Sequence, residues 1–589
     1  MLDHGLMARA RLGVAPLVSG SVARGPCAGW ALLALALVAA SACGGGDDPA
    51  VADAAVDAVT DAPADAGVDL SAALFPRDRL LDVRITMAPG DWDTLRNQEP
   101  GPPEATCASQ PGIEAYTYFR ASITIDGVTV SDVGVRKKGN LGSLSTTRPG
   151  LKIKAAEYVA GQRIAGQKQL TLNNNRQDET LVSQCLGYEL FRAAGLPAPR
   201  CAFARVWVNG TDLGVYSHVE TIRDQFLARH FADDTGRLYE SGGDFARGMT
   251  GGFQPKTDET MPDCSDLDRV VLALSAPDDE LVARLGAVVD LGQFMRYWAM
   301  EVVTGHWDGY ANNRNNYYFY HDPTSDRMHF IPWGIDALFT ERQRTTRPQS
   351  VYACGAMTWR LYDAAPTRAL YLAALRDVLA TVWDEAAIVA EVDRLQALLA
   401  PVVDPTGAAD YAERLDATRA FVRGRAAVLE AELARGEPVW PYASDESCLI
   451  RIGTIDATFS TTWGTLGQFG VGSATMRGVI GGVDATTSTG FASAGLDDQG
   501  AAAMQVLGQL PDGRFAVIFL GVNDPTRVRP GALPIDLRNQ FAALTFYDPV
   551  TMTATGGGLI LPGTLTFTRA ATTAGAPVVG TLTGTVIEL

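Results

Sequence analysis

Residues 305–339 read GHWDGYANNRNNYYFYHDPTSDRMHFIPWGIDALF and hold the most informative pattern in the chain. An apolar, helix-like segment ends at Gly305, and a turn rich in Asp, Asn and Gly leads into an aromatic strand over 317–320. A second strand runs into Trp333-Gly334-Ile335-Asp336. Asp308 and Asp336 are therefore expected at the mouths of two adjacent strands, where carboxylate and amide oxygens suit Mg²⁺ and phosphate chemistry.

The length and charge of the chain restrict its class. At 589 residues it is too long for one ordinary core, so two or more domains are expected. Its net charge of −18 argues against a nucleic-acid-binding surface, because such a surface needs an excess of Lys and Arg. We therefore expect a folded, multidomain protein that does not bind nucleic acid.

The N-terminus has the pattern of an export signal. Arginines precede a short apolar run over 30–40, and small residues follow at 40–42. The run is too short for a comfortable membrane span. Cys43 comes directly afterwards and resembles the cysteine of a bacterial lipobox, which implies removal of a signal peptide over 1–42 and a lipid anchor on Cys43. Ordinary signal cleavage beside an incidental cysteine is the alternative.

Residues 43–70 form an Asp- and Ala-rich linker in which Asp recurs every four residues. Pro63, Gly67 and repulsion between the aspartates favour a flexible, solvated stalk over a stable helix. Six cysteines lie beyond Cys43. In an exported protein they can form disulfides, whose pairing the sequence leaves open, and the absence of a CxxC pair argues against zinc.

Residues 71–440 alternate between strand and helix signals. Asp126-Gly127 and Asn209-Gly210 each separate alternating apolar runs, which predicts two β-hairpins. The other elements expected are a strand over 80–86, helices over 178–194, 224–231 and 291–304, and a mostly helical segment over 365–435. The pattern is that of an α+β domain.

Residues 447–589 differ in composition from the rest of the chain. They are rich in Gly, Thr, Val and Ala, with short alternating runs such as 515–520 and 565–568. This pattern predicts an all-β sandwich or barrel. No catalytic constellation is visible, so we expect a binding or spacer module with a surface ligand.

The order of elements between about 78 and 400 resembles the CotH family of spore-coat kinase-like proteins. Five segments carry the resemblance, namely 134–140 (GVRKKGN), 151–154 (LKIK), 189–200 (ELFRAAGLPAPR), 209–220 and 308–336. The resemblance implies that 71–440 is an atypical protein-kinase-like domain that transfers phosphate from ATP to Ser or Thr of proteins, with Mg²⁺ or Mn²⁺. Such chemistry needs a carboxylate at the substrate hydroxyl, oxygen ligands for the metal and a cation at the phosphates.

Asp308 is the candidate catalytic carboxylate under this resemblance. Asn313 follows by five residues, the spacing of Asp and Asn in the ordinary kinase catalytic loop, and is a candidate ligand of metal and nucleotide. Asn312 is an equally polar neighbour, and a cluster of Asx turns is the alternative interpretation. Asp336 is the candidate metal ligand. Many relatives carry W-D-x-D here, whereas this chain has Gly334 at the first Asp position.

Lys152 or Lys154 is expected to contact the ATP phosphates. Strand alternation puts both on one face, so the sequence does not choose between them, and an exposed lysine pair is the alternative. Arg136 can assist them, and Glu220, at a strand end, is a candidate neighbour of the nucleotide base. Relatives often carry Lys where Glu240 stands, which would reverse a charge near the nucleotide.

The leading hypothesis is an exported Ser/Thr protein kinase that uses ATP and Mg²⁺ and is anchored through Cys43 to a bacterial membrane, at the outer membrane or cell surface. The alternative is a weak or inactive kinase-like scaffold that acts as a surface binding or adhesion protein. Gly334 and Glu240 favour the scaffold, whereas the clustered Asp308 and Asp336 disfavour it. A carbohydrate-active protein with the two aspartates as acid and base would leave the lysines without a role.

Overall fold

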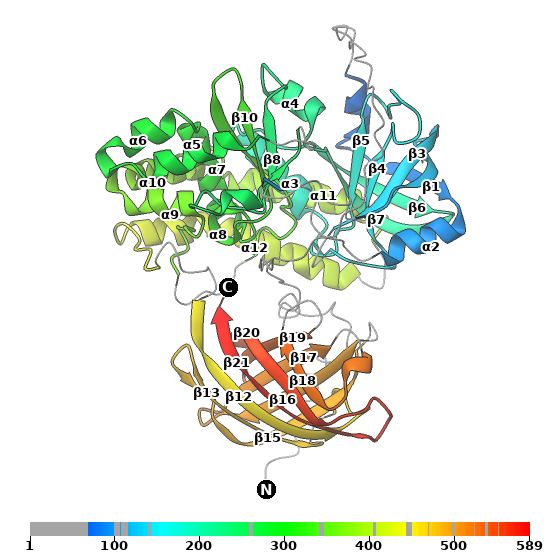
Figure 1. Cartoon of the computed structure of the whole chain (residues 1–589), viewed down its shortest axis with the longest axis vertical. Coiled ribbons are helices and arrows are strands. Elements are labelled where there is room, and N and C mark those ends of the chain that lie inside the picture. Colours follow the sequence, from blue (N-terminus) through cyan, green and yellow to red (C-terminus); the bar gives the residue numbers. More distant parts are fainter. Residues whose placement is uncertain are drawn as a thin grey trace, which may run out of the picture.

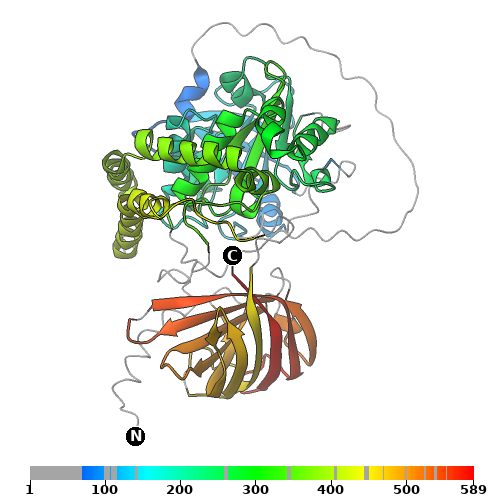
Figure 2. The same ribbon diagram turned by 90° about the vertical axis from the view of Figure 1, so that its left-hand side faces the viewer.

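The computed structural model describes residues 69–98, 106–107, 116–139, 143–257, 263–340, 347–403, 408–442 and 450–588, the last range with short gaps at 469, 498–500, 523–524, 536–539 and 552. The predicted signal over 1–42, Cys43 and nearly all of the 43–70 linker lie outside these residues. Figures 1 and 2 show a mixed body of strands and helices over 69–442 and, below it, a body made almost entirely of strands.

The first part of the mixed body is a closed barrel with the strand order β1-β2-β3-β4-β5-β7-β6, here called the N-terminal barrel. Both predicted hairpins are confirmed, since β2 pairs with β3 and β6 pairs with β7. Apolar side chains on alternate positions, such as Val83, Ile123 and Ile153, fill its interior. The elements are η2 (Leu70–Leu74), β1 (Leu81–Met87), α2 (Pro89–Asn97), β2 (Phe119–Ile125), β3 (Val128–Lys138), β4 (Gly150–Lys154), β5 (Gln169–Asn173), β6 (Cys201–Val208) and β7 (Thr211–Val219).

Strands β3 and β4 carry a row of basic residues on the outside of this barrel. In the antiparallel register, Arg136 lies opposite Lys152, and Lys138 lies opposite Gly150. The intervening Val135, Leu151 and Ile153 are buried in the barrel interior. Because side chains alternate along a strand, Arg136, Lys138, Lys152 and Lys154 share the outer face, which we call the basic face.

The second part of the mixed body, the helical lobe, combines helices with a four-stranded sheet of order β11-β10-β8-β9. The helix predicted over 291–304 is confirmed as α7, whose buried face includes Phe294, Trp298 and Val302. The elements are α4 (Asp224–His230), β8 (Arg237–Glu240), η3 (Thr250–Gly252), β9 (Gln254–Pro255), α5 (Ser265–Leu274), α6 (Asp278–Gly286), α7 (Leu291–Thr304), α8 (Tyr310–Asn313), β10 (Tyr317–Asp322), β11 (Arg327–Pro332), α9 (Ala356–Asp363), α10 (Ala365–Thr381), α11 (Glu385–Leu399) and α12 (Ala408–Leu433).

Helix α3 (Ser183–Ala193) comes from the barrel part of the chain but buries its apolar residues in the core of the helical lobe. The sequence predicted a helix from residue 178, five residues too early. The Asp178 carboxylate accepts hydrogen bonds from the Ser183 amide at 2.7 Å and the Thr180 amide at 3.1 Å. Residues 178–182 are therefore the turn that leads into the helix, because Asp178 satisfies an amide that has no partner within it.

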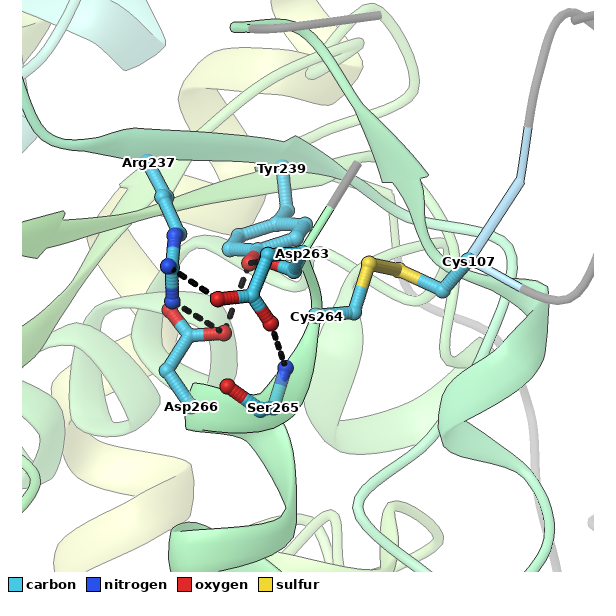
Figure 3. The surroundings of a disulfide bond; sticks show 7 residues. All are labelled: Cys107, Arg237, Tyr239, Asp263, Cys264, Ser265 and Asp266. Carbon is cyan, nitrogen blue, oxygen red and sulfur yellow. Dashed lines mark hydrogen bonds and ion pairs between the residues drawn. A yellow bond between two sulfur atoms is a disulfide. The ribbon is translucent and has the colours of Figure 1, made fainter. Parts of the chain in front are cut away.

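Two disulfides have both of their cysteines among the described residues, as the even number of cysteines allowed. Cys185 in α3 pairs with Cys201 at the start of β6, and Cys107 pairs with Cys264, just before α5. Figure 3 shows the second bond beside the polar residues at the start of α5. Cys107 lies between α2 and β2 in the sequence, and its amide donates to the Phe253 carbonyl at 2.9 Å. This bond therefore links the barrel part of the chain to the helical lobe.

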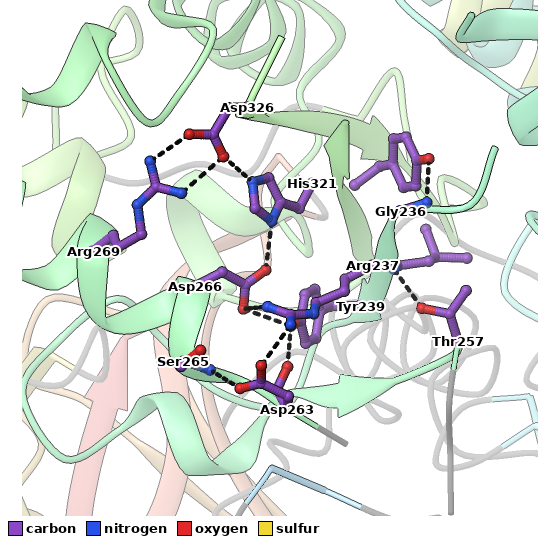
Figure 4. A network of polar contacts seen from close by, with 12 residues as sticks. Gly236, Arg237, Tyr239, Thr257, Asp263, Ser265, Asp266, Arg269, His321 and Asp326 are labelled. Atoms are coloured by element: carbon purple, nitrogen blue, oxygen red, sulfur yellow. Dashed lines mark hydrogen bonds and ion pairs between the residues drawn. The ribbon is translucent and has the colours of Figure 1, made fainter. Parts of the chain in front are cut away.

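A polar network fastens α5 to β10 (Figure 4). The two ring nitrogens of His321 each lie 2.9 Å from a carboxylate oxygen, one of Asp266 and one of Asp326. Arg269 donates two hydrogen bonds of 2.8 Å to Asp326, and Arg237 lies 3.6 Å from Asp266. Because both ring nitrogens face acceptors, the arrangement suits the doubly protonated imidazolium.

The C-terminal strands confirm the predicted all-β region and resolve it as a barrel. The ten-stranded sheet closes because β12 pairs with both β21 and β13. Its interior has a hydrophobic core of its own, including Phe459, Ile518 and Leu582. The elements are β12 (Ile450–Thr462), β13 (Ser473–Ile480), β14 (Val483–Asp484), β15 (Thr487–Leu496), β16 (Ala502–Gln509), β17 (Phe515–Val522), η5 (Pro525–Arg527), β18 (Gly531–Ile535), β19 (Gln540–Asp548), β20 (Thr553–Arg569) and β21 (Pro577–Glu588).

Within the described ranges, none of the helices combines the length and apolar character that a membrane crossing needs.

Candidate active site

Asp308 lies in the short loop between α7 and α8, as the sequence predicted. Gly305 ends α7 in the left-handed conformation, with φ of 70°. Three asparagine side chains then donate to the Asp308 carboxylate, Asn313 at 2.6 Å, Asn316 at 2.6 Å and Asn315 at 3.3 Å. The carboxylate is therefore held by amide donors in a fixed orientation and stays half-buried.

The structure distinguishes Asn313 from its neighbour Asn312, which the sequence could not. The amide nitrogen of Asn312 donates to the Trp307 carbonyl at 2.6 Å, and its oxygen accepts from Arg347 at 3.0 Å. Asn312 is fully engaged in holding the loop, whereas Asn313 contacts Asp308. Of these two asparagines, Asn313 is thus the one whose side chain contacts Asp308.

Glu301 positions the loop between α7 and α8. It was not among the site residues predicted from the sequence. It is completely buried in α7, and its carboxylate accepts hydrogen bonds of 2.8 Å from the amides of Tyr310 and Ala311, the first residues of α8. Tyr297 also donates to it at 2.7 Å. A carboxylate that caps a neighbouring helix stabilises its N-terminus. The one available signal was a single Glu within the apolar run YWAMEVVT.

Asp336 lies near Asp308 but not at the end of a strand, because β11 ends at Pro332 and Asp336 lies in the following loop. Asn173, the last residue of β5, donates to its carboxylate at 3.4 Å. Burial raises the pKa of Asp336 to about 6, the positive charge of Lys138 lowers it, and the negative charge of Asp308 raises it further. The site thus brings together the end of a barrel strand and two loops of the helical lobe.

Lys138 lies close enough to this site for its charge to act on Asp336, whereas the sequence favoured Lys152 or Lys154 for the phosphate contact. Burial lowers the pKa of Lys138, whereas the charges of Asp336 and Glu240 raise it. Within the described part of the chain, its ammonium makes no ion pair or hydrogen bond. Gly150 lies opposite on β4, and the absence of a side chain there leaves room for the Lys138 stem.

The other predicted cations lie along the same basic face. Lys154 forms an ion pair with Glu157 at 2.8 Å and lies over the ring of Tyr118. Arg136 is buried, and its guanidinium lies 5.3 Å from the centre of the same ring. Lys152 lies opposite Arg136 and is half-buried. The three residues therefore share the face of Lys138, whose charge acts on Asp336.

Glu220 and Glu240 have different surroundings. Glu220 is buried in an ion cluster with Arg200, at 2.9 Å, and with Arg229. No described contact joins Glu220 to Asp308 or Asp336. Glu240 forms an ion pair of 2.8 Å with the buried Lys256. This lysine directly follows β9 and balances the negative charge of Glu240.

The donor set can be tested for its fit to a divalent metal ion. Among the described residues, no three His, Cys, Asp or Glu side chains come together as a metal-binding group. The oxygens at hand are those of Asp336, Asn173 and Asn313, a mixed carboxylate and amide set of the kind Mg²⁺ accepts when phosphates and water complete its shell. These residues fit Mg²⁺ carried with a nucleotide better than a metal held by protein alone.

Comparison with known proteins relates this chain to one protein family. The family described as CotH kinase protein matches residues 135–429, about half of the chain. Inner spore coat protein H of Bacillus subtilis is 24% identical over 234 residues, which cover 37% of this chain and 64% of that protein. Invasin CotH7 of Rhizopus delemar is 22% identical over 262 residues, covering 41% of this chain and 44% of that protein. The chain thus spans less than two thirds of the length of each.

Proposed function

Because the chain belongs to the CotH family, we propose that it is an exported protein kinase that transfers the γ-phosphate of ATP to Ser or Thr residues of proteins. The observation that carries the proposal is that Asp308, held by asparagine amides, lies near the buried Asp336. The charges of Asp308 and Lys138 both act on Asp336. Phosphoryl transfer depends mainly on positioning and charge neutralisation, and these residues supply both.

Each residue has a defined task in this proposal. Asp308 accepts a hydrogen bond from the substrate hydroxyl and orients it towards the phosphate. Asp336, with the amide oxygens of Asn313 and Asn173, would hold Mg²⁺ or Mn²⁺, which neutralises charge on the phosphates when bound. Lys138, rather than Lys154, contacts the phosphates, with Arg136 and Lys152 next to it on the basic face.

The proposal includes a location at the cell surface. Two relatives are named as a spore coat protein and an invasin, which are surface proteins by name. We propose that a lipid on Cys43 anchors this chain to a bacterial membrane and that the C-terminal barrel binds a surface ligand. Labelling of growing cells with a fatty-acid analogue tests the anchor, since a Cys43→Ser variant should lose the label.

Incubation of the full chain, purified in detergent, with γ-labelled ATP and Mg²⁺ or Mn²⁺ tests the activity. The unmodified protein should transfer label to itself or to a generic protein substrate, and Asp308→Ala and Asp336→Ala should not. Lys154→Gln is the matched control for handling and should keep most of the transfer. Absence of label in the unmodified protein, or equal label in all variants, contradicts the kinase proposal.

A catalytically inactive scaffold that acts as a surface binding or adhesion protein is the second candidate. The observation that favours it is Gly334, at the position where the resemblance to the family implies a second Asp. A scaffold that lost nucleotide binding would show no change in melting temperature with ATP and Mg²⁺, whereas the kinase should be stabilised by both.

A further inference from the structure

A cavity lies on the opposite side of α3 from the Asp336 loop. It encloses about 180 Å³ between α3, α11, the start of β6 and the segment that follows η2. Cys185 and Glu189 of α3 line it, whereas Gly187, about half a turn away, packs against Ile335 and Leu338. The helix therefore separates this cavity from the candidate active site.

Positive charge predominates on the walls of the cavity. Four arginines line it, and two glutamates, Glu189 and Glu391, accompany them; the arginines are Arg77, Arg192, Arg200 and Arg394. Arg77 contacts Glu189 at 2.5 Å and Glu391 at 3.4 Å, and Arg394 contacts Glu391 at 2.6 Å. Both glutamates are thus already paired with Arg77 and Arg394.

The two remaining arginines differ in their partners. Arg200 contacts Glu220 and Asp69, each at 2.9 Å, so its charge is balanced. Arg192 donates to the carbonyl of Pro199 and, among the described residues, makes no ion pair. Arg192 therefore brings to the cavity wall a guanidinium that no direct ion pair engages, and the charges of Glu189 and Glu220 act on it only at longer range.

A disulfide fixes the geometry of these walls. Cys185 and Arg192 are seven residues apart and lie on one face of α3, and the Cys185–Cys201 bond attaches this face to the start of β6, next to Arg200. A site held in this way loses little side-chain freedom when a ligand enters, which favours binding.

We propose that this cavity binds a phosphate group through the guanidinium of Arg192. Guanidinium is planar and presents parallel donors that match the oxygens of a phosphate. The volume lies below the roughly 300–1,000 Å³ of pockets for drug-sized ligands, so it suits a small group rather than a nucleotide. The phosphate is either free or carried by a phosphorylated serine side chain, and both present the same dianionic head.

Titration calorimetry of the full chain with sodium phosphate and with O-phosphoserine tests this proposal, at an ionic strength kept constant with NaCl. We expect saturable binding at one site per chain, weakened at least tenfold by Arg192→Gln, which corresponds to about 1.4 kcal/mol. Arg192→Lys keeps the charge without the planar fork and should give an intermediate loss. Tighter binding of O-phosphoserine than of phosphate would identify a protein-borne group, and the reverse a free ion.

Two controls separate this site from the rest of the molecule. Arg284→Gln removes an exposed arginine that pairs with Glu280 on α6, and it should leave binding unchanged. Asp308→Ala should also leave it unchanged, because the cavity is separate from the active site. No saturable binding of either ligand, or equal binding by the Arg192 variants and the unmodified chain, overturns the proposal whether or not the protein is a kinase.

Discussion

Gly334 and Asn316 pack so closely that a β-carbon on Gly334 would lie 2.5 Å from the side-chain oxygen of Asn316. Gly334 also has a φ of +56°, a conformation that costs other residues about 1–2 kcal/mol. Asn316 in turn donates to Asp308 at 2.6 Å. The glycine therefore allows the close approach of the Asp336 loop to the asparagines that hold Asp308, the candidate catalytic carboxylate.

Gly334→Ala should lower the free energy of unfolding by about 2 kcal/mol or more, because it combines the left-handed backbone with displacement of Asn316. Gly210→Ala is the matched control, since Gly210 has a φ of +82° but open space around its missing side chain. Urea unfolding of both variants measures the difference. An equal loss in both would show that the contact with Asn316 carries no energy.

Gly334→Asp should not increase phosphate transfer, although it creates the W-D-x-D motif that the resemblance to the family implies. The new side chain begins at the same β-carbon and so pushes Asn316 away from Asp308. Transfer assays at saturating ATP and Mg²⁺ provide the measurement. A severalfold gain in rate would show instead that the missing carboxylate limits this protein.

Asn316→Ala should lower the free energy of unfolding more than Asn315→Ala does. The amide of Asn316 donates at 2.6 Å, whereas that of Asn315 lies 3.3 and 3.5 Å from the same carboxylate. A hydrogen bond to a charged acceptor contributes about 1.5–3 kcal/mol when it is short and well aligned. Thermal or urea unfolding ranks the two variants, and a larger loss in Asn315→Ala would contradict the assigned geometry.

Lys138→Gln should weaken the binding of ATP with Mg²⁺ at least tenfold, because it removes the cation whose charge acts on Asp336. Lys154→Gln is the comparison from the same face, and its small expected effect follows from the existing ion pair with Glu157. Titration calorimetry with a non-hydrolysable ATP analogue distinguishes them. A stronger effect of Lys154→Gln would return the phosphate contact to one of the two positions, Lys152 and Lys154, that the sequence left open.

The proposal of Lys138 in place of Lys152 or Lys154 illustrates a limit of prediction from sequence. Hairpins and α7 were predictable because turn residues and apolar periodicity are local signals, and the Asp308–Asn313 spacing is local as well. The charge of Lys138 acts on Asp336 because β3 approaches a loop almost two hundred residues later in the chain. No periodicity in the sequence indicates that approach. Glu301 was missed for a related reason. Its partners are backbone amides of α8, which reach its carboxylate only when α8 packs against α7.

Asp336 should make stability fall as the pH rises from about 4 to about 6. Its pKa in the folded protein is about 6, against about 4 in an unfolded chain, so over this range the folded state keeps a proton that the unfolded state has lost. The loss is on the order of 3 kcal/mol and is constant above pH 6. Asp336→Asn lacks this pH-dependent loss. The free energy of unfolding of the variant should therefore rise relative to that of the unmodified protein as the pH increases.

Urea unfolding of Asp336→Asn and the unmodified protein at several pH values measures this difference. Addition of Mg²⁺ and ATP provides a second readout, because only the ionised carboxylate attracts the cation. Their stabilising effect should therefore fade below pH 6 and be absent in Asp336→Asn. A difference between the two proteins that does not vary from pH 4 to pH 7 would contradict the buried environment of Asp336.

His321 should make stability depend on pH in the opposite sense to His329 on the neighbouring strand. Hydrogen bonds to Asp266 and then to Asp326 raise the pKa of His321, whereas burial lowers the pKa of His329. The contribution of His321 is therefore fully present below its unfolded pKa of about 6.5 and is lost as the pH rises through its higher folded pKa. That of His329 is lost as the pH falls below about 6.5.

Single His321→Gln and His329→Gln variants test these signs by urea unfolding between pH 5 and pH 9. His321→Gln should cost about 1 kcal/mol at pH 5.5, because it removes charge-assisted bonds that are partly screened by solvent, and less at pH 9. His329→Gln should instead be stabilising relative to the unmodified protein at the acidic end. Slopes of the same sign in both variants would show that the imidazolium of His321 is not what fastens α5 to β10.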